Sequence, residues 1–289
     1  ALAHGATGKG NDQIRFEQTW TYLAPQLEIL TPWKVWDFKG RSDLLEYLKS
    51  YPIELEAQNK RFSVDENMLH RSCEGDVLEE IDKPYNPDEV LKRVKLNGQS
   101  ETRLELTFER GMLTAIDGKT MPAQQLLTTL NEIGGQHGIG IVDLVEERTN
   151  GIKSRGIYET PGGSLIYRGL KALRDICQDK ITVNLQQKLG IEYANLVYEG
   201  LWHSPGRLAL ESFFEQANTA VTGKVQLLLK GHQILVQGRQ SEYSLYDKEL
   251  VSFESDAAGI NAAAVGFCKT LTLTQHKNGL QQQKLDKSR

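Results

Sequence analysis

The stretch GATGKGND at residues 5–12, near the front of the chain, combines glycines with polar and charged residues that could hold a ligand. Its glycines suggest a phosphate-binding loop, but it fits neither common template. A P-loop requires G-x-x-x-x-G-K followed by Ser or Thr, whereas here Gly10 follows Lys9 and Ala3 stands at the first glycine position. The dinucleotide fingerprint G-x-G-x-x-G fails as well, because Gln13 replaces its last glycine.

A helix is expected directly after this loop, with Asp12 as its N-cap and Pro25 at its end. Successive helical residues turn by about 100°, so Asn11, Asp12 and Arg15 share one polar sector. The N–H groups of a glycine-rich turn and of a helix N-terminus favour an anion, and one charge of each sign beside it would suit an amino-acid zwitterion. From spacing alone, an ordinary capped helix with surface charges explains these residues equally well.

The charge balance and the cysteines limit the function classes. The 289 residues carry 34 Lys and Arg against 38 Asp and Glu, a net charge of −4, which argues against a nucleic-acid-binding protein. No apolar run approaches the roughly eighteen residues of a membrane span, and no signal peptide is evident. Cys73, Cys177 and Cys268 lie far apart and form neither a metal-binding spacing nor a disulfide framework. We therefore expect a cytoplasmic protein without a protein-held metal, a nucleic-acid partner or a membrane partner.

The hydrophobic patterns divide the chain into three parts. Residues 1–52 are typical of an α/β segment, residues 53–255 of a larger α+β body, and residues 256–289 form a tail expected to pack on another subunit. The polar stretch 54–61 would link the first two parts. A glycine-rich loop normally follows a strand that aims it, and residues 1–4 could be only the end of such a strand. Since there is also no initiator Met, we expect the N-terminal part of the first domain to be missing.

Several elements follow from periodicity and from helix breakers. Alternating apolar residues predict a strand over residues 104–108. Helical spacing predicts a helix over residues 122–133 that Gly134-Gly135 would end. Ser42 would cap a short helix in the first part. The remaining expected elements are strands at 27–30 and 113–116, helices at 166–176 and 210–221, and a hairpin at 225–236.

Three polar segments look too specific to be simple connectors. They are SVDENMLHRSCE at residues 63–74, VEER at 145–148 after an apolar strand, and KSRGIYETPGG at 153–163. The last segment combines two cations, a tyrosine, a carboxylate and several glycines before a helix, a mixture typical of ligand-binding loops. Blander explanations exist for each of them. Ser63 and Glu66 also fit a helix capping box, the charges could be a solvated cluster, and Tyr158 could be a half-buried rim residue.

Together with HGATGKGNDQIRFE at residues 4–17 and LVYEGLWHSP at 196–205, these segments resemble the argininosuccinate synthase family, in the family's order and over nearly the whole chain. The resemblance implies condensation of citrulline with aspartate, in arginine biosynthesis or the urea cycle, through a citrullyl adenylate. This reaction would use ATP and Mg²⁺ and release AMP and pyrophosphate. The implied fold is the end of a Rossmann-like nucleotide-binding domain of the pyrophosphate-loop type, an α+β synthetase domain and a C-terminal oligomerisation tail, assembled as a homotetramer.

The resemblance also implies functional positions, residue by residue. Gly5 would contact ATP, while Thr7, Asn11 and Asp12 would contact aspartate. The implied citrulline contacts are Asn11, Arg15, Ser63, Ser72, Glu146 and Tyr158. VEER replaces the more usual V-E-N-R, and Cys73 stands where Tyr is common. We name no general base, because an adenylate mechanism needs mainly positioning and charge stabilisation.

One departure from the family is larger. The family's S-G-G-L-D-T-S loop, which holds the pyrophosphate of ATP, does not occur in these 289 residues, and two early citrulline contacts are missing with it. We therefore expect the chain alone to make no argininosuccinate. Two alternatives stay open at this point: a non-catalytic module for oligomerisation or ligand binding, and a different pyrophosphate-loop ligase.

Overall fold

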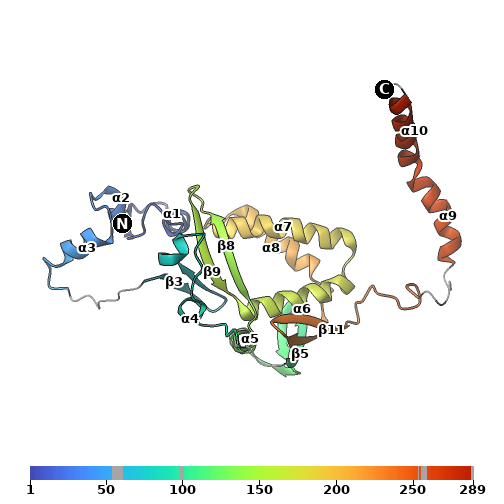
Figure 1. Cartoon of the computed structure of the whole chain (residues 1–289), viewed down its shortest axis with the longest axis horizontal. Helices are drawn as coiled ribbons and strands as arrows, with labels where there is room; N and C mark the ends of the chain where they lie inside the picture. Colours follow the sequence, from blue (N-terminus) through green and yellow to red (C-terminus); the bar gives the residue numbers. More distant parts are fainter. Residues whose placement is uncertain (54–60, 98–100, 253, 255–258, 288–289) are drawn as a thin grey trace. The chain divides into compact units, whose positions relative to one another are not determined.

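The computed structural model describes residues 1–53, 61–97, 101–252, 254 and 259–287. Within these residues the chain forms two compact units, Ala1–Tyr243 and Ser244–Arg289 (Figure 1). The expected link at 54–61 lies almost wholly outside the described residues. The expected domain boundaries after residues 52 and 255 stay predictions.

The N-terminal segment is a small parallel unit that positions the glycine-rich loop. Strand β1 (Leu2–Ala3) pairs in parallel with β2 (Ile29–Leu30), and helix α1 (Asp12–Leu23) connects them. The strand piece expected at residues 1–4 is present as β1, whereas the strand expected at 27–30 is limited to Ile29–Leu30. The glycine-rich loop leaves the carboxyl end of β1 and enters the N-terminus of α1. Parallel α/β units place ligand-binding loops at this edge. Two further helices follow, α2 (Pro32–Val35) and α3 (Arg41–Leu48).

Both predicted N-caps in this segment are wrong by one or two residues. Helix α1 has Asn11 rather than Asp12 at its N-cap position, and no side chain caps it. The Asn11 amide instead makes contacts far along the chain. Helix α3 begins after Gly40, so Ser42 lies inside its first turn. In its place, Asp43 accepts a hydrogen bond from the N–H of Lys39.

The three polar segments all contribute to a four-stranded antiparallel sheet of order β3-β4-β9-β8. The strands are β3 (Ser63–Glu66), β4 (Arg71–Glu74), β8 (Ile141–Glu147) and β9 (Lys153–Glu159). The capping-box explanation of Ser63 and Glu66 is thus wrong, because β3 is extended and pairs with β4. Most of the expected loop at 153–163 is a strand for the same reason. A 3₁₀ turn η1 (Asp76–Glu79) and a short helix α4 (Pro87–Val90) follow β4.

A second sheet has five antiparallel strands in the order β11-β10-β5-β6-β7. Its strands are β5 (Glu101–Glu109), β6 (Met112–Ile116), β7 (Lys119–Thr120), β10 (Gly223–Lys230) and β11 (Gln233–Gln240). The expected alternation is confirmed in β5, where Leu104, Leu106 and Phe108 are buried. The expected hairpin between β10 and β11 is confirmed too. Gly231 and His232 both have positive φ at its turn, as a two-residue hairpin requires.

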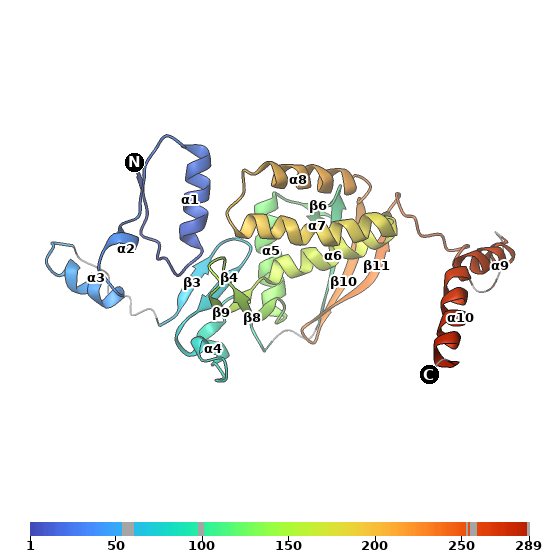
Figure 2. The same ribbon diagram turned by 90° about the horizontal axis from the view of Figure 1, so that it is seen from above.

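Helices α5 (Ala123–Gln136) and α6 (Pro161–Cys177) pack on this five-stranded sheet and on each other (Figure 2). Gly134-Gly135 does not end α5 as expected, because the pair lies within its last turn. A Cβ atom on Gly135 would sit 2.2 Å from the carbonyl oxygen of Arg93. The glycine therefore serves a close approach between chain segments rather than a helix stop.

Two further helices lie beyond α6 along the chain. Helix α8 (Pro205–Ala217) covers most of the predicted segment at 210–221. Helix α7 (Lys180–Tyr198) was not predicted, and it packs on α8. Its last residue, Tyr198, reaches the candidate site described below.

The second unit contains two helices, α9 (Ile260–Leu271) and α10 (Leu273–Lys287). Neither has a buried residue. Its expected role in oligomerisation stays a prediction. Among the described helices, none has the length and apolar character needed to cross a membrane.

Candidate active site

A cavity of about 1060 Å³ lies within the first unit, where the glycine-rich loop and α1 meet the four-stranded sheet and the end of α7. Every site residue expected from the sequence lines it, except Gly5. The lining residues are Thr7, Gly10, Asn11, Asp12, Arg15, Ser63, Asp65, Glu66, Asn67, His70, Ser72, Glu74, Glu146, Arg148, Tyr158, Tyr193, Ala194, Val197 and Tyr198.

Strand pairing brings the sheet residues of this group together. Ser72 and Tyr158 lie directly opposite each other in the β4–β9 pair. Asp65 is the partner of Ser72 in the β3–β4 pair, and its carbonyl oxygen lies 3.5 Å from the Ser72 hydroxyl. Residues far apart in sequence thus become neighbours, because opposite positions of an antiparallel pair carry adjacent side chains.

Glu146 is the centre of the hydrogen-bond network in this cavity. The Tyr158 hydroxyl donates to its Oε1 at 2.5 Å, and the Tyr198 hydroxyl donates to its Oε2 at 2.8 Å. Burial raises the pKa of Tyr158 well above its usual range, and the adjacent Glu146 carboxylate raises it further. Burial raises the pKa of Tyr198 as well. Both phenols therefore stay protonated donors near neutral pH, and Glu146 is an oriented carboxylate with lone pairs left for a ligand.

Asn11 joins the glycine-rich loop to this network. Its Nδ2 donates to the Tyr198 hydroxyl at 2.7 Å, and its Oδ1 accepts from the N–H of Thr149 at 3.1 Å. Arg15, one turn later on α1, donates from Nε to the carbonyl oxygen of Tyr198 at 3.0 Å. Its guanidinium also lies over the Tyr198 ring, 5.2 Å from the centroid.

The turn between β8 and β9 holds the loop from its other side. Arg148 donates from Nη1 to the carbonyl oxygen of Lys9 at 3.1 Å, and from Nη2 to Glu74 at 2.7 Å. Asn150 donates to the carbonyl oxygens of Gly8 and Lys9 at 3.3 and 3.0 Å. With these carbonyls occupied, the exposed Thr7 side chain and the carboxylate of Asp12 face the cavity. Asp12 also pairs with Arg15 at 3.3 Å.

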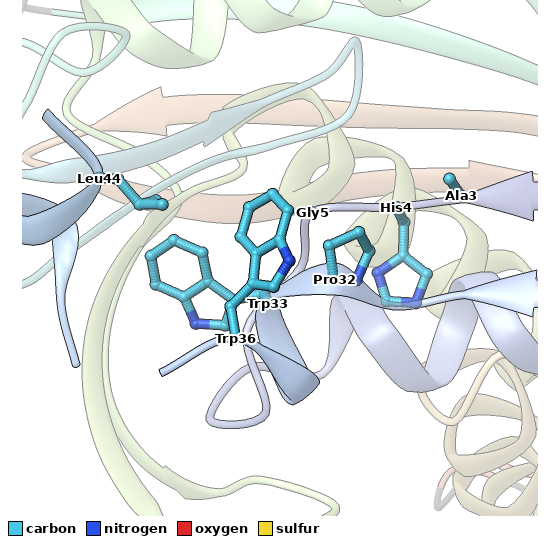
Figure 3. Close-up of a pocket in the computed structure, with 7 residues that line it drawn as sticks. All are labelled: Ala3, His4, Gly5, Pro32, Trp33, Trp36 and Leu44. Carbon is cyan, nitrogen blue, oxygen red and sulfur yellow. The ribbon is translucent and has the colours of Figure 1, made fainter. Parts of the chain in front are cut away.

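Gly5 lines a second, more apolar cavity of about 400 Å³ (Figure 3). Its lining residues are Ala3, His4, Gly5, Pro32, Trp33, Trp36 and Leu44. Figure 3 shows the indole rings of Trp33 and Trp36 toward one side and His4 beside Ala3 toward the other. The buried His4 ring is fixed there, since Nδ1 accepts from the N–H of Ala6 at 3.1 Å and Nε2 lies 3.1 Å from Glu17. The short loop from Gly5 to Asp12 therefore borders both cavities.

Charged side chains of both signs line the larger cavity. The carboxylates of Asp12, Glu74 and Glu146 share the lining with Arg15 and Arg148. Within the described part of the chain, no three His, Cys, Asp or Glu residues are grouped so that they could hold a metal. A ligand with an ammonium and a carboxylate would find partners for both groups here.

Tyr198 lines the candidate site and contacts its residues, although the sequence did not predict a role for it. It lies in the LVYEGLWHSP segment on which the resemblance rests, but no role was expected for it. Its contacts depend on the end of α7, a helix that the sequence did not reveal. One signal in the sequence could have identified Tyr198. It is a tyrosine within a family motif, at a position that no predicted helix or strand explained.

Comparison with known proteins places both parts of the chain in one family. Residues 1–54 match the family model of the arginosuccinate synthase N-terminal HUP domain, and residues 62–278 match that of the arginosuccinate synthase C-terminal domain. The chain is 42% identical over 296 residues to the argininosuccinate synthase of Desulfitobacterium hafniense, covering 97% of this chain and 72% of that protein. It is 43% identical over 272 residues to that of Caldicellulosiruptor saccharolyticus (92% and 67%), and 42% identical over 294 residues to that of Nitrobacter hamburgensis (99% and 71%). The chain therefore belongs to the argininosuccinate synthase family.

Proposed function

We propose that this chain takes part in the ATP-dependent condensation of citrulline with aspartate, which gives argininosuccinate, AMP and pyrophosphate. The observation that carries this proposal is the single cavity in which Asn11, Arg15 and Glu146 meet, with Glu146 oriented by two tyrosine hydroxyls. Family membership supports the same reaction. It would make the chain a cytoplasmic enzyme of arginine synthesis.

The reaction needs activation of a poor electrophile. The ureido oxygen of citrulline attacks the α-phosphorus of ATP, and pyrophosphate leaves. The resulting adenylate has a good leaving group, so the amine of aspartate attacks the former ureido carbon. AMP leaves with the electrons of the C–O bond, and the nitrogen of the new C–N bond loses a proton. No covalent bond to the protein forms, so the chain's own task is to align two amino acids and to stabilise charge.

Citrulline would lie along the larger cavity with its ammonium at Glu146. The carboxylate is the natural partner of this cation, because its two oxygens are held in place but keep free lone pairs. The hydroxyls of Ser63 and Ser72 would donate to the citrulline carboxylate. The ureido group would then extend toward Asn11 and Arg15, beside the glycine-rich loop.

Aspartate and ATP would meet at that loop. Thr7 and the loop N–H groups would hold the aspartate carboxylates, and Asp12 would face its ammonium. ATP would approach from the cavity at Gly5, where Trp33 and Trp36 offer aromatic faces to the base. Stacking of a base on an aromatic ring contributes about 1–3 kcal/mol. Mg²⁺ would enter with ATP, since this ion is usually held by substrate phosphates and one or two carboxylates.

Turnover by these 289 residues alone is not expected, because the S-G-G-L-D-T-S loop for pyrophosphate is not among them. Ligand binding is therefore the direct test. Isothermal titration of the chain with citrulline should give saturable binding, which Glu146→Gln should weaken strongly. Glu147→Gln is the matched control, since Glu147 is an exposed neighbour paired with Lys153 at 3.2 Å. No citrulline binding, or equal binding by both variants, would contradict the proposal.

The assembly is proposed to be a homotetramer in which α9 and α10 contact other subunits. The side chains of Val265, Phe267 and Leu271 on α9 are exposed within their unit, and apolar residues on one helix favour contact with a partner surface. Light scattering should give four times the chain mass, and deletion of residues 256–289 should lower it. An unchanged mass after the deletion would contradict a role for these helices.

A further inference from the structure

Tyr198 makes three polar contacts with the candidate site, and their donors and acceptors can be assigned. An ionised carboxylate only accepts, so the Tyr198 hydroxyl must donate to Glu146. The same hydroxyl then has only lone pairs for Asn11, so Asn11 must present its Nδ2 to it. The Thr149 N–H independently requires Oδ1 of Asn11 on the other side. Both contacts fix the same orientation of the Asn11 amide.

The backbone and ring of Tyr198 fix a second residue. Its carbonyl oxygen accepts from Arg15 Nε at 3.0 Å, and its ring lies under the Arg15 guanidinium. The turn that follows α7 lies directly against α1 at this point, since a Cβ atom on Gly200 would lie 2.7 Å from the Cα atom of Arg15. This close approach holds the segment after α7 against α1 at Arg15.

The protonation state of Tyr198 suits this arrangement. Burial raises its pKa, and the hydrogen bond to Glu146 raises it further. The hydroxyl therefore stays a donor to Glu146 and an acceptor for Asn11 across the neutral pH range.

We propose that Tyr198 is a positioning residue for citrulline, which sets the Asn11 amide, the Arg15 guanidinium and the Glu146 carboxylate in one mutual geometry. This inference rests on the proposed function. Asn11 and Arg15 are assigned to the ureido end of citrulline and Glu146 to its ammonium, so Tyr198 fixes the distance between the two ends of the ligand site. It needs no contact with the ligand itself, because its hydroxyl is already used by two protein groups.

The test is Tyr198→Phe in the whole chain, which removes the hydroxyl but keeps the ring and the carbonyl oxygen that hold Arg15. Citrulline affinity should fall roughly 10- to 100-fold, as expected when a hydrogen bond to a charged group is lost. Tyr167→Phe is the matched control, since that hydroxyl belongs to an exposed side chain on α6. It should bind citrulline like the unchanged chain.

A double-mutant cycle separates positioning from a general structural effect. Since Tyr198 acts through Asn11, Tyr198→Phe combined with Asn11→Ala should weaken binding by much less than the product of the two single effects. Independent, multiplying effects would overturn the inference, as would citrulline binding by Tyr198→Phe at unchanged affinity.

A ligand-free measurement keeps the inference testable by itself. The side-chain NH₂ resonances of Asn11, identified by their loss in Asn11→Ala, should shift in Tyr198→Phe and stay in place in Tyr167→Phe. Unmoved resonances would overturn the assigned hydrogen bond. If they shift but the unchanged chain binds no citrulline, the proposed function fails and the positioning role for citrulline fails with it, while the hydrogen bond stands.

Discussion

The hydroxyl of Tyr158 on β9 lies 2.5 Å from Oε1 of Glu146 on the neighbouring strand β8. Ser63 lies on β3, at the other edge of the same sheet. Tyr198 donates to the second oxygen of the same carboxylate from a different element. A carboxylate held by two phenols keeps its charge in a fixed place. This arrangement is suited to the recognition of an ammonium group at one defined distance from the loop.

The first prediction concerns the charge of Glu146. Glu146→Gln keeps the shape but removes the negative partner of the substrate ammonium. Removing one partner of a buried charge pair costs about 2–5 kcal/mol, or roughly 30- to several-thousand-fold in the Kd for citrulline. Calorimetric titration measures the change, and Glu147→Gln should leave the Kd within about threefold. A small effect of Glu146→Gln would show that the ammonium lies elsewhere.

The second prediction concerns alkaline stability. Burial and Glu146 raise the pKa of Tyr158 in the folded chain, whereas the unfolded chain has a pKa of about 10. The folded state therefore holds this proton more tightly. The contribution of Tyr158 to the free energy of unfolding is complete below about pH 10, and it is lost as the pH rises from there through the folded-state pKa. Urea unfolding at pH 8 and pH 10.5 should show a smaller pH-dependent loss in Tyr158→Phe than in the unchanged chain, and an equal loss would contradict the prediction.

The third prediction concerns the buried ion pair beneath the site. Glu159 accepts hydrogen bonds from Arg71 at 2.9 Å and from the N–H groups of Lys92, Arg93 and Val94. Glu159 is fully buried, so Glu159→Gln leaves Arg71 without its charge partner and should lower the free energy of unfolding by about 3–5 kcal/mol.

Asp175→Asn is the control for this ion pair. Asp175 pairs with Lys171 at 3.4 Å on the surface, and such pairs contribute about 0–1 kcal/mol. Chemical denaturation of both variants provides the comparison. A similar loss of unfolding free energy in the two variants would contradict the prediction that the Arg71–Glu159 pair stabilises the chain more than a surface pair does.

The fourth prediction compares two glycines inside helices. Gly135→Ala places a methyl group against the Arg93 carbonyl oxygen, and should destabilise the chain by about 1–3 kcal/mol. Gly190 in α7 has no neighbouring atom within 4 Å of its Cβ position, so Gly190→Ala should stabilise the chain by up to about 1 kcal/mol. Thermal unfolding should thus shift in opposite directions, and a shared direction would contradict the packing argument.

The elements that local patterns govern could be predicted from the sequence. Strand β5 and the β10–β11 hairpin follow from alternation and from Gly231-His232, and α5 follows from apolar spacing. The same patterns predicted the wrong end for α5, because Gly135 is required by the close approach of the Arg93 carbonyl oxygen. Arg93 lies far from Gly135 in the sequence, so no local pattern reveals this contact. The capping-box explanation of Ser63 and Glu66 was equally local, and pairing with β4 overrides it.

The residues of the candidate site came from motifs, not from periodicity. Motif matching could name Glu146 and Tyr158, but not the hydrogen bonds that orient them. Tyr198 is bound to Asn11 by a contact that spans 187 positions of the chain. Such a pair is determined by how α7 packs against α1, which no local pattern specifies.

The last prediction concerns the glycine-rich loop at residues 5–12. Neither phosphate template fits it, and its Gly8 and Lys9 carbonyls are held by Asn150 and Arg148. The Thr7 hydroxyl and the Asp12 carboxylate remain at the cavity, as a receptor for the carboxylate and ammonium of aspartate would require. Thr7→Ala and Asp12→Asn should therefore raise the Kd for aspartate. Where a charge-assisted contact is lost, the binding free energy should weaken by about 2–5 kcal/mol, which corresponds to a roughly 30- to several-thousand-fold higher Kd.

The Kd for ATP should change much less in both variants, because the base is expected at the separate cavity of Trp33 and Trp36. Thr21→Ala, at an exposed position of α1, should leave both ligands unaffected. Titration of each variant with aspartate and with ATP distinguishes the two roles of the loop. Loss of ATP binding with normal aspartate binding would contradict this assignment. Thr7 would then contact a phosphate of ATP rather than a carboxylate of aspartate, and the loop would be a phosphate site.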